Sequence, residues 1–301
     1  MRRLSWRAVA IGVTALPLLA SCSAGPLAGR AAPVEVPAVG AGPVYVPARP
    51  ANFAFAGELT QGGWVKGTAP SGTRTLTLDG KPVAIAPDGS FFAAFDRDAG
   101  PVATLVATSR TGEQATRTLT ISRRAWAIEN VNIARRQAGP TEAFLALRRP
   151  ELARIDAARA LQTDAQGWRQ DFIYPVKARI SGRFGSQRVY RGEPGAYHSG
   201  LDLAGGAGTP YVAPAGGVVI LVAERPFTLE GNLLMIDHGM GLNSAFLHSS
   251  AILVREGEHV KQGQVIGRIG ATGRATGPHL HWSLKWNDAR LDPILFTGPM
   301  K

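Results

Sequence analysis

The stretch Gly-Pro-His-Leu-His-Trp at residues 277–282 alternates histidine with large apolar residues. Because successive side chains of a β-strand point to opposite faces, the alternation predicts a strand on which His279 and His281 share one face, about 6.6 Å apart. One imidazole could then bind a metal while the other projects into the same cleft. β-branched runs punctuated by glycine surround this strand over residues 172–301, and all six histidines lie among them. We therefore expect a mainly β domain here that carries the chemistry.

A second signal is the sequence Tyr-His-Ser-Gly-Leu-Asp at residues 197–202. On a straight strand His198 and Asp202 would lie about 13 Å apart, whereas two zinc ligands must each come within about 2 Å of the metal. The glycine between them and the glycine-rich residues 205–208 disfavour a helix. We therefore predict a turn that brings both side chains to one point. His248, at the end of another apolar run, is a candidate catalytic group.

These motifs resemble those of the lysostaphin-type (LytM-like) zinc metallopeptidases, which cut the peptide part of peptidoglycan. The resemblance covers residues 172–296 and includes further motifs at residues 182–185, 208–210, 236–241, 263–267 and 276–278. It implies that His198, Asp202 and His281 bind Zn2+. It also implies that His248 and His279 assist the attacking water and stabilise the transition state. The implied fold is an antiparallel β-sheet of barrel-sandwich type.

Three protein ligands leave one zinc position open, which is the arrangement of a catalytic site. The chain lacks the H-E-x-x-H signature whose glutamate serves as base, so His248 and His279 would manage the protons, one as base and the other as oxyanion donor. The implied substrate is a cross-link or stem peptide of peptidoglycan; in a Gram-negative wall this is the bond between D-alanine and meso-diaminopimelate. Two residues depart from the family pattern, Phe246 in place of tyrosine and Ser249 in place of leucine. The missing phenol is expected to alter substrate binding.

The first 22 residues have the features of a bacterial export signal, because three arginines precede an apolar run that is too short for a membrane span. Residues 19–22, Leu-Ala-Ser-Cys, resemble a lipobox, which implies that Cys22 is acylated. The alternative is an ordinary signal peptide with an incidental cysteine. Residues 23–50 are rich in Pro, Ala, Gly and Val and predict an extended tether. We expect an exported, periplasmic protein whose lipid anchor lies in the outer membrane.

The chain has a net charge of +11, and the signal segment contributes only three of these positive charges. The rest of the chain therefore stays basic. Nucleic acid is one partner for such a charge, but no basic motif interleaved with aromatic residues is present. We expect no nucleic-acid partner. The expected partners are peptidoglycan, the membrane through the lipid anchor, and an envelope regulatory protein.

Residues 51–122 contain short alternating runs, such as residues 73–78, separated by Asp-Gly turn signals. This pattern predicts a small Ig-like β-sandwich, which we interpret as a spacer or pairing module. Residues 123–171 shift to Ala, Arg, Glu, Gln and Leu and predict a short helical connector, with a helix over 151–166 and Pro150 at its first turn. Four arginines of the connector predict a solvent-exposed face: Arg135, Arg136, Arg148 and Arg149.

Two other functions are compatible with parts of the pattern. A catalytically silent relative could bind peptidoglycan or activate an amidase, but such members lose zinc ligands and here all five functional positions are filled. A lipoyl- or biotinyl-carrier barrel could explain the glycine-spaced residues 254–269, but Lys261 lacks the carrier motif and the histidines would have no role. Of the remaining histidines, we expect His238 to be structural and His259 to be exposed.

Overall fold

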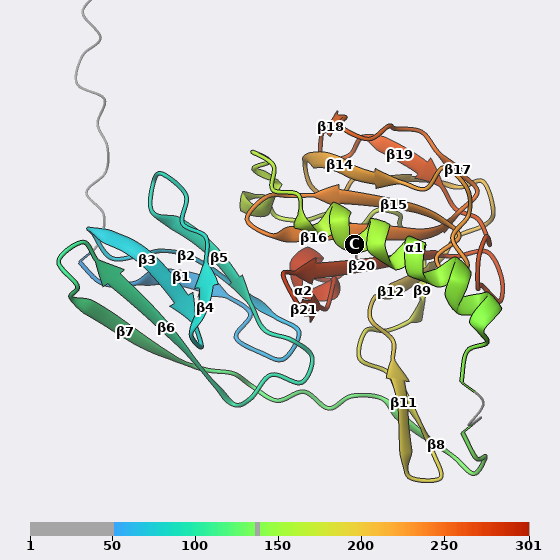
Figure 1. The fold of residues 1–301 in the computed structure, drawn as a ribbon, viewed down its shortest axis with the longest axis horizontal. Helices are drawn as coiled ribbons and strands as arrows, with labels where there is room; N and C mark the ends of the chain where they lie inside the picture. The colour runs from blue at the N-terminus through green and yellow to red at the C-terminus, as the bar shows by residue number, and fades with distance from the viewer. Residues whose placement is uncertain (1–50, 136–138, 301) are drawn as a thin grey trace, which may run out of the picture. The chain divides into compact units, whose positions relative to one another are not determined.

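The computed structural model describes residues 51–135 and 139–300. The predicted signal peptide, Cys22, the tether over 23–50 and Arg136 lie outside these residues. The described chain is mainly β, as predicted (Figure 1). Among the described residues, no helix combines the length and the apolar character needed to cross a membrane.

Residues 54–120 form two antiparallel sheets, as expected of a sandwich. The first has the order β1-β2-β5 and the second β4-β3-β6-β7. The bounds are β1 (Ala54–Gly57), β2 (Trp64–Thr68), β3 (Thr73–Leu78), β4 (Lys81–Val83), β5 (Ser90–Ala94), β6 (Val102–Ser109) and β7 (Gln114–Thr120). The alternating run is β3, whose Leu76 and Leu78 are buried. Asp79 and Gly80 make the following turn with φ values of 50° and 78°, in the left-handed region that tight hairpins need.

In its described residues, 123–135 and 139–171, the connector contains one strand, β8 (Ile128–Val131), and one long helix, α1 (Glu142–Ala160). The predicted bounds of the helix were wrong, since it begins before Pro150, which lies inside it. Thr141 caps the start by accepting a hydrogen bond from a backbone N–H of the first turn. The helix ends early because the N–H and hydroxyl of Thr163 both donate to Asp237, at 3.1 and 2.6 Å, and draw the chain onto the sheet.

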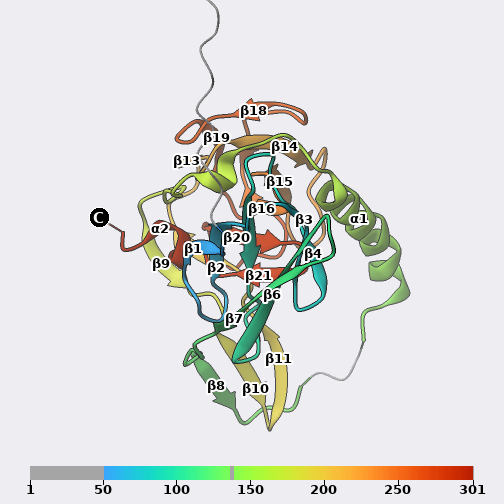
Figure 2. The ribbon, with the colours of Figure 1, turned by 90° about the vertical axis from the view of Figure 1, so that its left-hand side faces the viewer.

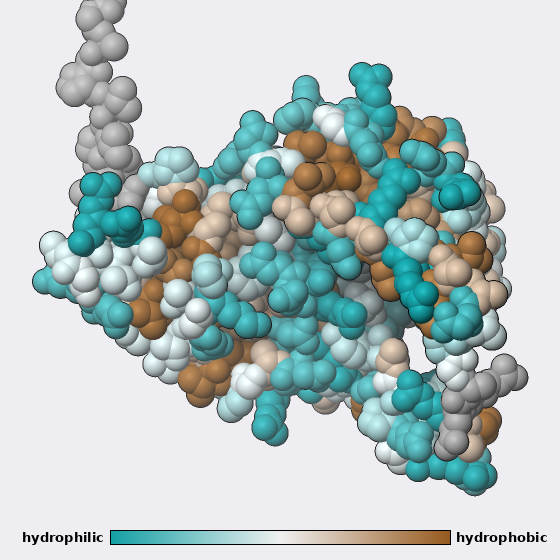
Figure 3. Space-filling model, in the orientation of Figure 1, coloured by the Kyte–Doolittle hydropathy of each residue, from teal (hydrophilic) through white to brown (hydrophobic). Residues whose placement is uncertain are grey.

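Helix α1 packs one side against the C-terminal part of the chain. Ile155 and Ala158 are buried in a cluster with residues of β14 and β15. Figure 3 shows hydrophilic residues interspersed with hydrophobic ones over this helix, where Leu147 and Leu152 remain exposed. Residues 167–169 then form a short 3-10 turn (Gly167–Arg169) that leads into the C-terminal domain.

The C-terminal domain is built on an eight-stranded antiparallel sheet of order β18-β14-β15-β16-β20-β12-β9, with β21 paired to β20. Its strands are β9 (Arg179–Gly182), β12 (Leu201–Ala204), β14 (Gly217–Val222), β15 (Asn232–Asp237), β16 (Leu242–Ser249), β18 (His259–Val260), β20 (Leu280–Trp286) and β21 (Ala289–Leu291). The H-x-H segment enters β20, and the apolar Leu280 and Trp282 are fully buried, as predicted.

Two smaller sheets complete the domain, with orders β13-β19-β17 and β11-β10-β8. Their strands are β10 (Gln187–Tyr190), β11 (Glu193–Tyr197), β13 (Pro210–Val212), β17 (Ala251–Ile252) and β19 (Val265–Arg268), and a short helix follows, α2 (Ile294–Thr297). In the second sheet the connector strand β8 pairs in parallel with β10 (Figure 2). The connector is therefore part of the C-terminal architecture as well as a link to it.

Candidate metal centre

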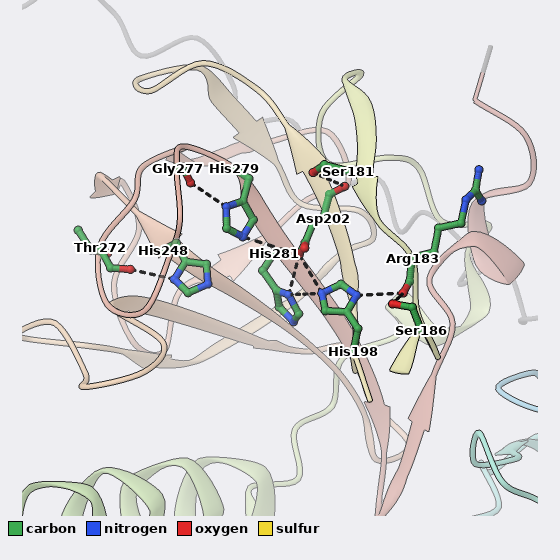
Figure 4. A network of polar contacts seen from close by, with 10 residues as sticks. All are labelled: Ser181, Arg183, Ser186, His198, Asp202, His248, Thr272, Gly277, His279 and His281. Atoms are coloured by element: carbon green, nitrogen blue, oxygen red, sulfur yellow. Dashed lines mark hydrogen bonds and ion pairs between the residues drawn. The ribbon is translucent and has the colours of Figure 1, made fainter. Parts of the chain in front are cut away.

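Three side chains from separate segments converge at the end of β12 (Figure 4). Asp202 on β12 and His281 on β20 are cross-strand partners, and His198 lies in the turn between β11 and β12. The Asp202 Oδ1 atom lies 3.0 Å from His198 Nε2 and 2.8 Å from His281 Nδ1, while the two nitrogens are 3.1 Å apart. The predicted turn between His198 and Asp202 is present. The three groups offer one ligand atom each, all within 4.8 Å of one another.

The surroundings orient these atoms toward a common point. His198 Nδ1 donates to the carbonyl of Arg183 at 3.0 Å (Figure 4), which leaves the lone pair on Nε2 directed at the cluster. This second contact is typical of metal-binding histidines. Gly182 and Gly200 make room for the cluster, since a Cβ at the first would collide with the Asp202 carboxylate and one at the second with the His281 ring.

The charges at the cluster suit a divalent cation. Burial by itself raises the pKa of Asp202, but its close contacts with the imidazoles of His198 and His281 outweigh burial and hold the pKa well below the ordinary value. The pKa of His281 is lowered by burial. For His198 burial acts in the same direction, but the contact with Asp202 prevails and raises the pKa. An ionised carboxylate flanked by two imidazoles is a donor set that fits Zn2+.

His248 and His279 lie beside this cluster (Figure 4). Their ring centroids are 4.9 Å apart, and His248 is 6.3 Å from the ring of His281. Each donates Nδ1–H to a backbone carbonyl at 2.8 Å, His248 to Thr272 and His279 to Gly277. The Nε2 atom of each ring is therefore left with its lone pair. The His279 Nε2 atom lies 3.8 Å from Asp202 Oδ1. All five candidate residues of the sequence lie together.

The backbone at His248 is unusual. Its φ of 65° lies in the left-handed region, which is uncommon for a residue other than glycine. The N–H of His248 donates to the Glu230 carbonyl at 2.8 Å. The loop before β15 therefore supports a candidate catalytic side chain.

The expectation for Phe246 was wrong. Phe246 is the cross-strand partner of Trp282, and both are fully buried, so the ring lies on the core side of the sheet and away from His281. It stacks on Tyr211, with ring centroids 5.5 Å apart, and the Tyr211 hydroxyl contacts Ser249 Oγ at 2.7 Å. The two departures from the family pattern therefore form a buried packing unit and do not line the cleft.

A cleft of about 1180 Å³ opens at His198 and Asp202. Its other walls come from β10, β11, the loop at Arg274 and the connector, which contributes Ile128, Glu129, Ile133 and Arg135 among others. The connector therefore lines the cleft, whereas its composition predicted only a helical link with a solvent-exposed face. The two remaining histidines are as expected: His259 is exposed, and His238 is buried, with Nδ1 donating to the Gly216 carbonyl at 2.8 Å.

The chain is similar to known peptidases. Residues 196–293 match the model of peptidase family M23. A crystal structure of a peptidase assigned to M23 from Pseudomonas aeruginosa superposes with a TM-score of 0.62 at 30% identity, covering 80% of this chain and 95% of that chain. The chain therefore belongs to peptidase family M23, which confirms the resemblance seen in the sequence.

Curated relatives match over the same region. The peptidoglycan DD-endopeptidase ShyA of Vibrio cholerae is 43% identical over 114 residues, which are 37% of this chain and 26% of ShyA. The DD-carboxypeptidase/endopeptidase Mpg of Neisseria meningitidis is 39% identical over 128 residues, 41% of this chain and 28% of Mpg. The matched segment thus spans about a quarter of the length of these relatives.

Proposed function

We propose that the protein is a zinc-dependent endopeptidase that hydrolyses peptide cross-links or stems of peptidoglycan. The observation that carries the proposal is the convergence of His198, Asp202 and His281 at one point, with His248 and His279 beside them and a cleft that opens at His198 and Asp202. We assign zinc binding to the first three residues and catalysis to the other two. The division of the chain at residues 51–122, 123–171 and 172–301 is proposed with it.

In this mechanism zinc supplies Lewis acidity, since it polarises the scissile carbonyl and makes water nucleophilic near neutral pH. Asp202 supplies the negative charge that favours a cation at this point. The Nε2 atoms of His248 and His279 handle the protons of the reaction: the neutral imidazole of one accepts the proton of the attacking water on Nε2, and the other, protonated on Nε2 as an imidazolium, donates to the developing oxyanion. The carbonyls of Thr272 and Gly277 fix the orientation of these imidazoles.

The proposed bond is the one between D-alanine and meso-diaminopimelate. The names of the relatives support this choice, because they include peptidoglycan DD-endopeptidases and a DD-carboxypeptidase/endopeptidase. The cleft also has the size to receive a peptide, since its volume of about 1180 Å³ exceeds the 300–1,000 Å³ typical of pockets for small ligands.

The proposed location is the periplasm, with the outer membrane as the site of a lipid anchor on Cys22. The lipobox-like residues 19–22 and the tether composition of residues 23–50 support it. A further relative, 33% identical over 130 residues, is named lipoprotein NlpD/LppB homolog of Pseudomonas aeruginosa. Peptidoglycan and the membrane are then the partners, together with an envelope protein that regulates the activity.

The experiment is digestion of cross-linked muropeptides by the zinc-loaded protein, followed by mass spectrometry. We expect cleavage products of the D-alanine to meso-diaminopimelate bond, and a loss of at least about 100-fold in rate for His248→Ala and His279→Ala. His259→Ala is the control, because His259 is an exposed histidine of the same domain. If the folded, zinc-loaded protein releases no new product, the proposed function is wrong.

A further inference from the structure

Residues of the predicted spacer make specific contacts with the C-terminal domain. Trp64 Nε1 donates to the Leu295 carbonyl at 3.0 Å. The Asp96 carboxylate accepts a hydrogen bond from the Arg290 N–H at 2.9 Å. The first contact attaches β2 to the C-terminal domain, and the second attaches the loop after β5, residues 95–101. Arg97 lies in this loop.

Arg97 is the most deeply buried arginine among the described residues, with only 6% of its surface exposed. Its Nη2 donates to the Gly185 carbonyl and to Gln187 Oε1, both at 3.0 Å. The guanidinium carbon lies 4.6 Å from the ring centroid of Tyr197 and 5.2 Å from that of Trp126. Arg97 thus holds a turn of the C-terminal domain, residues 183–187, by hydrogen bonds and cation–π contacts.

The same turn makes hydrogen bonds with the backbone N–H, the backbone carbonyl and the Nδ1 atom of His198, and leaves only Nε2 without a contact to the turn. The Gly185 N–H donates to the His198 carbonyl, and the His198 N–H donates to the Ser186 carbonyl, both at 2.8 Å. The Arg183 carbonyl accepts from His198 Nδ1 at 3.0 Å (Figure 4). The backbone and the ring of His198 are therefore both placed by the turn that Arg97 holds.

The turn cannot easily take another position. Gly185 has a φ of 81°, and a Cβ there would collide with the Trp126 ring, so the turn is packed directly under this indole. Trp126 is itself stacked with the Arg97 and Arg124 guanidinium groups. If Arg97 moved, the Gly185 carbonyl would lose its hydrogen bond and the Trp126 ring that packs on Gly185 would lose its contact with the guanidinium.

We propose that Arg97 is a positioning residue for His198, and that the segment 51–122 is part of the scaffold of the metal centre rather than a spacer. The inference rests on the proposed function in that His198 is taken as a zinc ligand. Residues that orient a metal ligand from outside the coordination sphere typically change metal affinity by 10- to 100-fold when they are replaced. Arg97 acts one step further out, so we expect about a 10-fold effect.

The test measures zinc affinity by competition with a chromophoric chelator, in the absence of peptidoglycan. Arg97→Met removes the charge and all hydrogen bonds of the guanidinium, including the one that Nη1 donates to Asp98 at 2.8 Å. Arg97→Lys keeps the charge but lacks the planar guanidinium that contacts the Tyr197 and Trp126 rings. We expect both variants to bind zinc about 10-fold more weakly, and the Co2+-substituted variants to have altered visible spectra. For Arg97→Lys, excess zinc should restore most of the cleavage rate. Arg74→Met is the matched control, because Arg74 is an exposed arginine on β3 of the same segment.

The outcomes separate this inference from the proposed function. If the wild-type chain binds zinc and cleaves muropeptides while both Arg97 variants match its affinity and Co2+ spectrum, Arg97 does not position His198 and the inference is wrong. The same conclusion follows if the variants lose only thermal stability. If the wild-type chain binds zinc without cleaving, the proposed function fails, and the affinity difference still decides the role of Arg97. If Arg97→Met does not fold, Arg97→Lys decides alone.

Discussion

Replacing Arg148 with methionine is expected to destabilise the protein by about 3 kcal/mol. Arg148 on α1 binds both carboxylate oxygens of Glu230 at 2.6 Å and one of Glu151 at 3.0 Å. The three side chains are 11%, 15% and 13% exposed, so the prediction of a solvent-exposed arginine was wrong at this position. Without the guanidinium, two carboxylates would share a mostly buried site with no cation, which is the costly case of a broken buried pair.

Calorimetry of the Arg148→Met variant should show the loss as a fall of roughly 6 to 12 °C in the unfolding midpoint, at about 2 to 4 °C per kcal/mol for a chain of this size. Arg149→Met is the control. The Arg149 side chain is 66% exposed, and its contact with Glu142 is long, at 3.4 Å. Its removal should therefore lower the free energy of unfolding by less than about 0.5 kcal/mol. Equal unfolding midpoints for the two variants would show that Arg148 does not stabilise the two carboxylates.

The same substitution should also lower catalysis. The Glu230 carbonyl accepts the N–H of His248, whose left-handed backbone needs support from its neighbours. When the Glu230 side chain is released from α1, His248 should sample other orientations. The rate of muropeptide cleavage at saturating substrate should then fall about 10-fold with little change in KM. A turnover equal to that of Arg149→Met would contradict the link between α1 and His248.

Three further predictions concern packing and protonation. Gly182→Ala should weaken zinc binding at least about 10-fold, because the new Cβ would displace the Asp202 carboxylate; unchanged affinity in a chelator competition would count against it. Burial lowers the pKa of His238 from 6.5 to about 4, so the unfolded chain binds the proton first and stability should fall by up to about 3 kcal/mol as the pH drops from 6.5 to 4. In denaturant titrations across that range, the free energy of unfolding of the wild type should fall more steeply with falling pH than that of His238→Gln. Phe246→Tyr should cost about 1 to 3 kcal/mol in urea unfolding, because it adds a hydroxyl inside the stack with Tyr211; a gain in stability would contradict this.

The sequence predicted the parts of the fold whose signals are local. The period-two run at residues 73–78 is strand β3, and the H-x-H segment enters β20 with its apolar residues buried. The spacing of His198 and Asp202 predicted a turn because a strand would hold those side chains too far apart and the glycines around them disfavour a helix, and the turn is there.

The parts that it missed depend on long-range contacts. Strand β8 is only four residues long and pairs with β10 about 60 residues later, so no periodic pattern marks it. The start of α1 was missed because Pro150 suggested a first turn, whereas the cap is Thr141. The role suggested for Arg97 has no local signature either, since it depends on a turn 88 residues away. Sequence motifs therefore predict which residues form the site, but they do not predict the distant residues that position those side chains.

The central claim is that His198, Asp202 and His281 together hold one zinc ion. The most direct measurement is the zinc content of the purified, reconstituted protein, determined by elemental mass spectrometry alongside Asp202→Ala, with circular dichroism to verify that both are folded. We predict one zinc per wild-type chain and almost none in the variant after dialysis. A folded wild-type chain without zinc, or a variant that retains it in full, would contradict the account.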